Sequence, residues 1–411
     1  MKKIPFIILL TITCWSCSLF EGDGENDNIP NLRELTPEEQ ELVSSTNQFA
    51  FDVFMNIQTK YSSENFFISP LSIEYALAMT LNGADGTTLD AIKSTLNTES
   101  MSESEINDAY QSLTEFLISL DKTVELSIAN SVWNDNAYTV KSSFIDVMNT
   151  YYAAYVEGLD FSEPDAKNTI NNWVNEETHG KIKELIDQIP PEAVMYLINA
   201  IYFKADWTYE FDESLTEKGD FFLDDGSKIL VDMMTSNGAE INYYSNNTFQ
   251  LIDIPYGNGQ YYMTILLPSE NESTSSVTEL LSTTNLMEWL NGSNVITTQL
   301  IMPKFKIEFK TSLNEALSTL GMGIAFGDGA DLSRLFEDPI DLFISRVLHK
   351  AVIEVDEKGS EAAAATAVEV SLTSADPGNP LTILIDRPFV FLIREKHSNH
   401  ILFAGQLSNP S

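Results

Sequence analysis

The spacing of apolar residues changes along the chain, from a helical period early to strand-like runs later. Apolar positions recur at helical spacing in segments that predict helices at 37–57, 71–81, 89–96, 105–120 and 168–184. Strand-like apolar runs occupy 197–203, 249–254, 261–267, 297–309, 389–393 and 400–407. Helices gathered early and strands gathered late favour an α+β fold with antiparallel sheets over a repeating βαβ unit.

We expect the first residues to form an export signal rather than part of the fold. A short basic start precedes an apolar run at 4–12, which is too short to span a membrane as a helix. Cys14 and Cys17 form a C-x-x-C, but no strand-helix context of a redox centre surrounds it. Cys17 resembles the lipid-modified cysteine of bacterial lipoproteins. Cys14 replaces the usual aliphatic residue at the −3 position, so either cysteine is a candidate for lipidation.

The chain therefore divides into a leader, a linker and one domain. We expect residues 1–16 to be a lipoprotein signal peptide, 17–36 an acidic flexible tether rich in Gly and Asn, and 37–411 a single domain. This organisation predicts an exported bacterial lipoprotein of the cell envelope, at the outer-membrane surface or facing the periplasm or the extracellular space, that meets the membrane only through its lipid. Because Cys14 lies in the signal peptide and Cys17 at the start of the tether, the domain at 37–411 would have no internal disulfide.

Charge and motifs exclude several classes of function. The chain has 61 acidic and 23 basic residues and a net charge of −38, which repels nucleic acid and heparin. It contains no G-x-S-x-G and no H-E-x-x-H motif. His397 and His400 are three apart in an expected hairpin, where a polar turn explains them better than a metal site. We therefore expect no enzyme activity, no metal and no cofactor.

The stretch EKGSEAAAATAVEVSLTS, residues 357–374, is unusual in an acidic chain. As a helix it would be capped by Ser360, since alanine is the best helix former. As a strand it would carry Glu361 and Glu369 on one face and only small or apolar residues on the other. Such a strand could enter between two existing strands without overpacking the core, or stand exposed in water. Gly359 supplies a pivot between the two states.

This stretch resembles the hinge and reactive-centre loop of the serpins. Further segments resemble the family in the same order, and together they span about residues 40–411. They are NFFISPLSIEYALAMTLNGADGTT from Asn65, INNWVNEETHGKIKELI from Ile170, LINAIYFKADW from Leu197, PKFKIEF from Pro303, GADLSRL from Gly329, LHKAVIEVDEKGSEAAAAT from Leu348 and DRPFVFLIREKHSNHILFAGQLSNP from Asp386.

The resemblance implies a fold and a mechanism. The fold would be a monomeric domain of three β-sheets and eight or nine helices with an exposed reactive-centre loop. Serpins of the inhibitory kind are suicide substrates. A target protease cleaves the loop and forms an acyl-enzyme, and the freed segment then inserts into the main sheet and carries the protease away. The alternative is a non-inhibitory serpin that binds a ligand or a partner in the cell envelope.

The resemblance also assigns roles to residues of this chain. The hinge would consist of Glu357, Gly359, Ser360, Glu361, Ala362, Ala363, Ala364, Ala365 and Thr366. A polar latch beneath the main sheet would consist of Ser69, Asn199 and His349. Insertion would start at Trp207, Lys304 and Glu357, the last two forming an ion pair.

Counting as the family does, sixteen residues beyond Glu357, places the cleaved bond at Thr373–Ser374. Residues 374–386 are longer than usual, so Leu372–Thr373 is the rival bond. No Lys or Arg occurs at 359–385, which argues against trypsin-like targets. Thr373 suits elastase-like or subtilisin-like enzymes and Leu372 suits chymotrypsin-like ones, and cysteine proteases remain further candidate targets.

Overall fold

The computed structural model describes residues 30–338, 341–360 and 381–411. Within these ranges it contains the following α-helices: α1 (Pro37–Lys60), α2 (Pro70–Leu81), α3 (Gly86–Thr95), α4 (Glu103–Leu120), α5 (Ser142–Tyr151), α6 (Pro164–Glu177), α7 (Thr274–Thr278), α8 (Thr283–Asn291) and α9 (Asn314–Thr319). Helices α1 and α4 begin with capping boxes at Thr36 and Ser102. In each, the cap hydroxyl accepts from a backbone N–H of the first turn, and a glutamate of that turn accepts from the backbone N–H of the cap residue.

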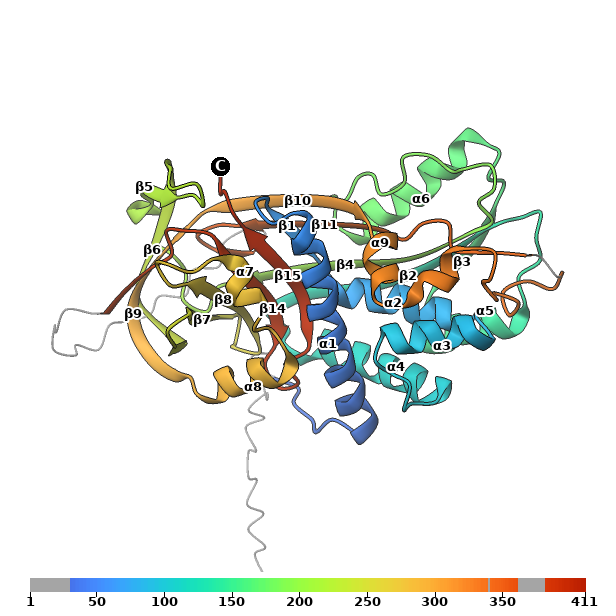
Figure 1. Ribbon diagram of the computed structural model, residues 1–411, viewed down its shortest axis with the longest axis horizontal. Coiled ribbons are helices and arrows are strands. Elements are labelled where there is room, and N and C mark those ends of the chain that lie inside the picture. Colours follow the sequence, from blue (N-terminus) through green and yellow to red (C-terminus); the bar gives the residue numbers. More distant parts are fainter. Residues whose placement is uncertain (1–29, 339–340, 361–380) are drawn as a thin grey trace, which may run out of the picture.

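The strands form two hydrogen-bonded sheets (Figure 1). The six-stranded sheet has the order β10 (Phe305–Ser312), β11 (Leu348–Val355), β12 (Gly359–Ser360), β4 (Met195–Asp206), β2 (Val124–Asp135) and β3 (Tyr155–Leu159). The nine-stranded sheet has the order β1 (Phe66–Ile68), β15 (Ile401–Leu407), β14 (Phe389–Glu395), β8 (Tyr261–Pro268), β7 (Phe249–Tyr256), β6 (Lys228–Ser245), β9 (Asn294–Pro303) and β13 (Leu381–Leu384), with β5 (Glu217–Phe222) on β6.

Two of the three expected sheets join through the long strand β6. Its last residues, Asn242–Ser245, pair with β7, whereas Met233–Tyr243 pair with β9. The pairing with β9 shifts at a bulge between Asn237 and Ala239, where Gly238 adopts a left-handed φ of 78°. A bulge increases the local twist, so one strand can serve two differently oriented groups of neighbours.

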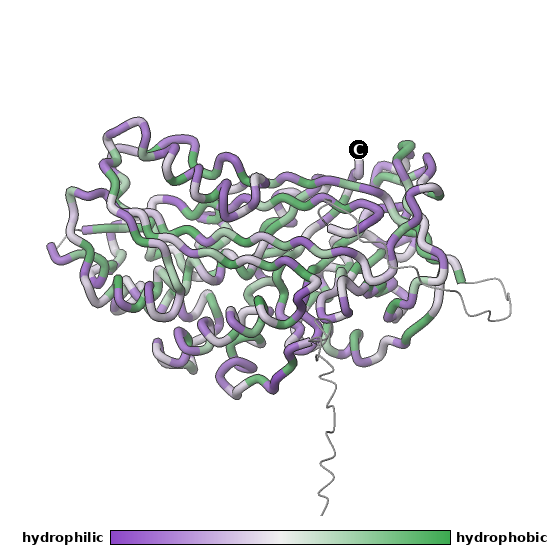
Figure 2. The backbone as a smooth tube through the Cα atoms, turned by 180° about the vertical axis from the view of Figure 1, so that it is seen from behind, coloured by the Kyte–Doolittle hydropathy of each residue, from purple (hydrophilic) through white to green (hydrophobic). Residues whose placement is uncertain are grey.

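The six-stranded sheet lies between helices (Figure 1). Helix α6 packs on its outer face, against β2 and β4, and α2 packs on its inner face against β4. In the tube view the strands run across the molecule with hydrophobic and hydrophilic positions alternating (Figure 2). The main core lies on the inner side, and a smaller apolar cluster around Trp133 and Ile170 lies between α6 and the sheet.

The predicted elements match the observed ones where the apolar period is local, but two predicted ranges need correction and several observed elements were not predicted. The predicted helix at 168–184 begins earlier and ends at Glu177, because His179 and Gly180 adopt positive φ. The predicted strand at 297–309 is two strands, β9 and β10, which separate at Lys304. The elements that were not predicted include the strands β2, β6 and β11 and the helix α5.

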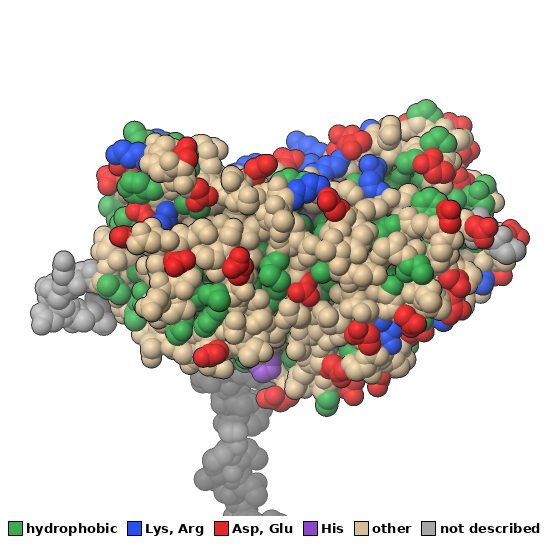
Figure 3. All heavy atoms as spheres, in the orientation of Figure 1, with side chains coloured by type: hydrophobic (Ala, Val, Ile, Leu, Met, Phe, Trp, Pro, Cys, Tyr) green, Lys and Arg blue, Asp and Glu red, His purple; other side chains and the backbone are tan. Residues whose placement is uncertain are grey.

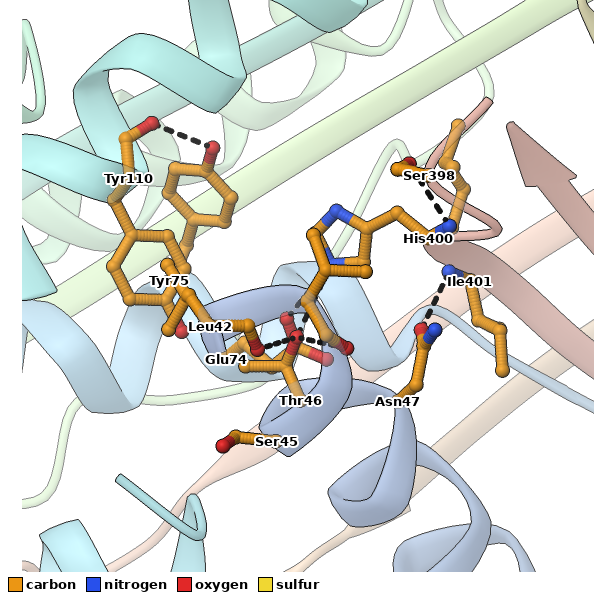
Figure 4. Close-up of polar contacts among 12 residues, drawn as sticks. Leu42, Ser45, Thr46, Asn47, Glu74, Tyr75, Tyr110, Ser398, His400 and Ile401 are labelled. Atoms are coloured by element: carbon orange, nitrogen blue, oxygen red, sulfur yellow. Dashed lines mark hydrogen bonds and ion pairs between the residues drawn. The ribbon is translucent and has the colours of Figure 1, made fainter. Parts of the chain in front are cut away.

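A buried polar cluster joins α1, α2 and the start of β15 (Figure 4). His400 Nε2 lies 3.4 Å from Glu74 Oε2 and 3.3 Å from Thr46 Oγ1. The Thr46 hydroxyl donates to the carbonyl of Leu42, so it accepts from the imidazole. His400 lies in the expected turn between β14 and β15, but its side chain is buried, because the helix packing encloses it. Glu74 Oε1 and His400 Nδ1 have no hydrogen-bond partner among the described residues.

We predict that Glu74 makes stability fall as pH rises. Burial raises the pKa of Glu74 above its ordinary value of 4.5, so the folded state favours the protonated carboxyl. The free energy of unfolding therefore decreases as pH rises from 4.5 through the raised pKa of the folded state. The variant Glu74→Gln cannot ionise at this position. Its melting temperature relative to that of the natural chain should therefore increase as pH rises from acidic to alkaline. Thermal melts across this pH range test the prediction. Glu270→Gln, at an exposed loop position, is the control. Equal pH profiles for all three proteins would contradict it.

Candidate functional site

The six-stranded sheet has room for a further strand between β4 and β11. Strand β12, only two residues long, pairs with Val355 of β11 on one side and with Ala205 and Asp206 of β4 on the other. Beyond it, a cavity of about 370 Å³ is lined by both strands, by α2 on one face and by residues of the segment 178–194 on the other. The backbone groups that face this cavity are those that an entering strand would pair with.

The hinge residues that the structure describes already occupy the top of this gap. A Cβ at Gly359 would lie 2.0 Å from the carbonyl oxygen of Ala205, so only glycine fits so close to β4. The next residue, Ser360, is buried and its hydroxyl lies 2.5 Å from the hydroxyl of Tyr256. Ser360 therefore faces inward, as the even positions of the predicted strand pattern should.

Several predicted site residues cannot be placed. The hinge residues Glu361, Ala362, Ala363, Ala364, Ala365 and Thr366, the candidate bond residues Leu372, Thr373 and Ser374, and both cysteines lie outside the described residues.

Glu357 is held by two donors where the gap begins. Lys304 Nζ lies 2.7 Å from Glu357 Oε2, and the Thr216 hydroxyl donates to Oε1 over 2.9 Å. Burial alone would raise the pKa of Glu357, but the hydrogen bonds from Lys304 and Thr216 hold that pKa below its ordinary value. The carboxylate is therefore ionised at neutral pH and fixes the chain just before the hinge.

Trp207 fixes the same turn from the β4 side. Its indole N–H donates to the carbonyl of Asp356 over 2.9 Å, and its backbone N–H donates to the carbonyl of Lys358 over 2.7 Å. Its ring stacks on Tyr256 at 4.3 Å between centroids. Trp207 and Lys304 thus hold the turn at 356–358 from two sides, and the expected ion pair between Lys304 and Glu357 is present.

The predicted latch is only partly assembled. The backbone N–H of Ser69 donates to His349 Nε2 over 3.1 Å, so this nitrogen is an acceptor and the imidazole is neutral. Burial lowers the pKa of His349 to about 4, which keeps it neutral at physiological pH. The Ser69 hydroxyl donates to the carbonyl of Leu402 over 2.8 Å. Ser69 and His349 therefore join α2, β11 and β15 beneath the gap.

Asn199 lines the same cavity but bonds elsewhere. Its amide donates to Asn130 Oδ1 on β2 over 2.9 Å, and the Asn130 amide donates to the carbonyl of Tyr152 over 2.8 Å. The Ser72 hydroxyl on α2 donates to the carbonyl of Asn199 over 3.2 Å. Sequence reasoning missed Asn130 and Ser72. Asn130 is a polar residue inside an apolar strand, which could have marked it as a candidate. That mark is visible only once β2 has been predicted.

Other kinds of site receive no support from the described part of the chain. There, no group of three or more His, Cys, Asp or Glu side chains is placed to hold a metal ion. No helix in the described ranges is long and apolar enough to cross a membrane.

Known proteins resemble this chain in sequence and in fold. The family model described as serpin (serine protease inhibitor) matches residues 44–410. An uncharacterised serpin-like protein of Methanosarcina acetivorans is 34% identical over 99% of this chain and 98% of its own length. Leukocyte elastase inhibitor of Bos taurus is 33% identical over 90% of this chain and all of its own length.

Solved structures agree with this match. The crystal structure of human thyroxine-binding globulin complexed with thyroxine superposes with a TM-score of 0.82 at 31% identity, covering 91% of this chain and 100% of that one. The fold is therefore the expected α+β serpin fold. The chain belongs to the serpin family.

Proposed function

We propose that this serpin is an inhibitor of serine endopeptidases that acts as a suicide substrate. The observation that carries the proposal is β12, which already begins a strand between β4 and β11 above a cavity that the described residues line. The following residues are small or uncharged at every inward position up to Leu372. Cleavage of the loop would free this segment to continue inward, with an attached protease carried along as an acyl-enzyme.

The energy balance supports strand insertion as the driving force. Each new backbone hydrogen bond contributes roughly 1 kcal/mol net, so a dozen or more residues entering a sheet would gain roughly 10 kcal/mol. Ordinary domains are stable by only about 5–15 kcal/mol. The uncut molecule would therefore be held kinetically above a deeper minimum.

The loop sequence bounds the choice of target. We propose Thr373–Ser374 as the cleaved bond and elastase-like or subtilisin-like enzymes as targets, with Leu372 and chymotrypsin-like enzymes as the rival assignment. The absence of Lys and Arg at 359–385 removes the cation that a trypsin-like pocket needs. Similarity to a leukocyte elastase inhibitor supports the same choice. We further propose export with a lipid on Cys17.

A ligand-binding serpin is the second candidate function. The structural similarity to thyroxine-binding globulin complexed with thyroxine favours it. A serpin that only binds a ligand does not need a hinge able to enter the sheet, so its hinge is free to carry bulky or charged residues. In this chain the inward hinge positions remain small. We therefore favour inhibition.

Incubation with elastase or subtilisin tests the proposed function directly. We expect a covalent complex that survives boiling in detergent, because the inserted segment would trap the acyl-enzyme. The cleaved serpin should melt at a higher temperature than the uncut one, and mass spectrometry of the released peptide should locate the bond. Clean cleavage without a complex would support the ligand-binding alternative instead.

A charge on the inward face of the hinge should convert the inhibitor into a substrate. Ala364 shares its parity with the inward-facing Ser360, so Ala364→Arg would have to bury a cation beneath the sheet. The matched control is Ala363→Arg, which places the same charge on the outward face. We expect a complex with Ala363→Arg and turnover without a complex with Ala364→Arg. Equal inhibition by both variants would show that the inward face is wrongly assigned.

His349 should make the uncut protein less stable in acid. Its pKa falls from 6.5 to about 4 on folding, so the unfolded chain takes up the proton first. The stability contributed by the neutral imidazole is present above pH 6.5 and is lost as pH falls to about 4, at most on the order of 3 kcal/mol. His349→Gln should lack this loss in thermal melts, whereas His397→Gln, at an exposed position, should retain it. Identical acid slopes in all proteins would refute the assignment.

A further inference from the structure

The segment 30–36 leads into α1 and lies on the domain without helix or strand structure. It is fixed at its start, where the backbone N–H of Asn31 donates to the carbonyl of Leu120, the last residue of α4, over 3.1 Å. Much of the segment is nevertheless exposed, including Leu32 and Glu34. Exposed irregular segments near a terminus are the preferred places for proteases to cut a folded protein.

This segment contains one residue that a trypsin-like protease could use. Arg33 is the only Lys or Arg in the sequence between positions 4 and 59. Because such enzymes need a cation in their primary pocket, Arg33–Glu34 is the one bond at which they could separate Cys17 from an intact domain. The reactive loop cannot trap them, since residues 359–385 contain no Lys or Arg. The chain is therefore vulnerable at Arg33 to the class of protease that it is not expected to inhibit.

The side chain of Arg33 is held by residues of α1 and α4. Its Nη1 donates to Glu39 Oε2 over 2.7 Å and its Nη2 donates to Glu39 Oε1 over 2.5 Å, so the pair is bidentate. Nη2 also donates to the hydroxyl and to the carbonyl of Ser112, over 3.0 and 3.2 Å. The guanidinium carbon lies 5.0 Å from the centre of the Phe116 ring. We call Arg33, Glu39, Ser112 and Phe116 the clamp.

The clamp is hard to open because its carboxylate is buried. The side chain of Glu39 is 1% exposed and that of Arg33 is 37% exposed. Burial alone would raise the pKa of Glu39, but hydrogen bonding, above all from Arg33, holds that pKa below its ordinary value. Glu39 is therefore ionised at neutral pH, and a buried carboxylate that loses its cation is costly. In the space-filling view, acidic side chains also predominate at the lower right, over α4 and the start of α1 (Figure 3).

The Arg33–Glu34 bond lies just outside the first helix. Thr36 caps α1, and its backbone N–H donates to Glu39 Oε2 over 2.7 Å. A cut after Arg33 leaves this capping box on the domain side. The chain from residue 34 to residue 411 also keeps every residue assigned to the hinge, the latch and the start of insertion. Cleavage at this bond would therefore release a complete domain.

We propose that Arg33–Glu34 is a shedding site for arginine-directed proteases and that the clamp controls it. While the clamp is closed, the bond is exposed but its arginine cannot enter a protease pocket. When the clamp opens, water adds across the bond, Arg33 gains the new carboxylate and Glu34 gains the new amino group. The domain then separates from the fragment that carries Cys17. The cut is independent of inhibition, whereas release from a membrane rests on the lipid proposed for Cys17.

Limited proteolysis of the full chain tests this proposal. Trypsin is added to the folded protein at neutral pH, and mass spectrometry follows the new N-terminus at Glu34. Glu39→Gln still accepts from the backbone N–H of Thr36 but loses the charge that holds Arg33, so this cut should become about tenfold faster, as expected for a charge-assisted pair. Arg33→Lys keeps a cation that trypsin accepts but cannot form the bidentate pair, and it should also be cut faster than the natural chain.

Two control variants separate the clamp from general effects of charge and stability. Glu38→Gln removes the same charge from the same helical turn at an exposed position, so the rate at Arg33 should stay unchanged. Asp253→Asn removes a carboxylate of equal burial from its pair with Arg394 on β14, far from the clamp in the chain. It should lower the melting temperature and leave the rate at Arg33 unchanged, because cleavage there follows local opening.

A second arm measures release from membranes prepared from bacteria that express the full chain. Trypsin should move the domain into the supernatant, and it should do so faster for Glu39→Gln than for the natural chain. Arg33→Gln offers no cation to the enzyme, so its domain should remain with the membranes. The released domain should form the same detergent-resistant complex with elastase as the uncut chain.

The outcomes distinguish the shedding site from the proposed function. Equal cleavage rates for the natural chain and Glu39→Gln would overturn control by the clamp, and no cut after Arg33 in any variant would overturn the site itself. A cut after Arg33 in a chain that never associates with membranes supports the site and overturns the lipid on Cys17. A released domain that forms no complex with elastase, like an uncut chain that forms none, supports the site and overturns inhibition alone.

Discussion

Everything in this molecule depends on two neighbouring strands, β4 and β11, that are held apart along most of their length. Among the described residues β12 pairs with both strands at one end, and beyond it residues of both strands line a cavity. Unpaired backbone groups near an apolar core are costly, so the arrangement is maintained by its surroundings. The polar latch beneath the gap and the segment 178–194 on its other side are those surroundings.

The polar groups around the gap act as positioning devices. Ser69 and His349 tie α2 to β11, whereas Asn199 is tied to Asn130 on β2. Helix α2 is anchored to both walls of the cavity, since the Ser72 hydroxyl also donates to the carbonyl of Asn199 on β4. Glu357 and Trp207 fix the turn that delivers the hinge to the gap. The site thus suits the entry of a strand, whose backbone would pair with β4 and β11, while the polar side chains hold these strands in place.

Much of this could be predicted from the sequence. The helices and strands with a strong apolar period were predicted nearly to their ends, and motif order indicated the fold before any geometry was known. The inward parity of the hinge followed from alternation alone, and Ser360 faces inward as expected. The division of 297–309 into two strands and the early end of α6 were not predicted. The apolar pattern of the sequence continues past Lys304 and His179, although the backbone turns there.

What the sequence by itself determined is therefore local: periodicity, caps, charge balance and the small face of the hinge, all set by residues close together in the chain. Only the tertiary structure decided which distant groups meet. The pairing of Glu74 with His400, 326 positions apart, and of Asp187 with Lys310, 123 apart, left no signal in the local pattern. Contacts of this kind depend on how sheets and helices pack, and packing is a property of the whole chain.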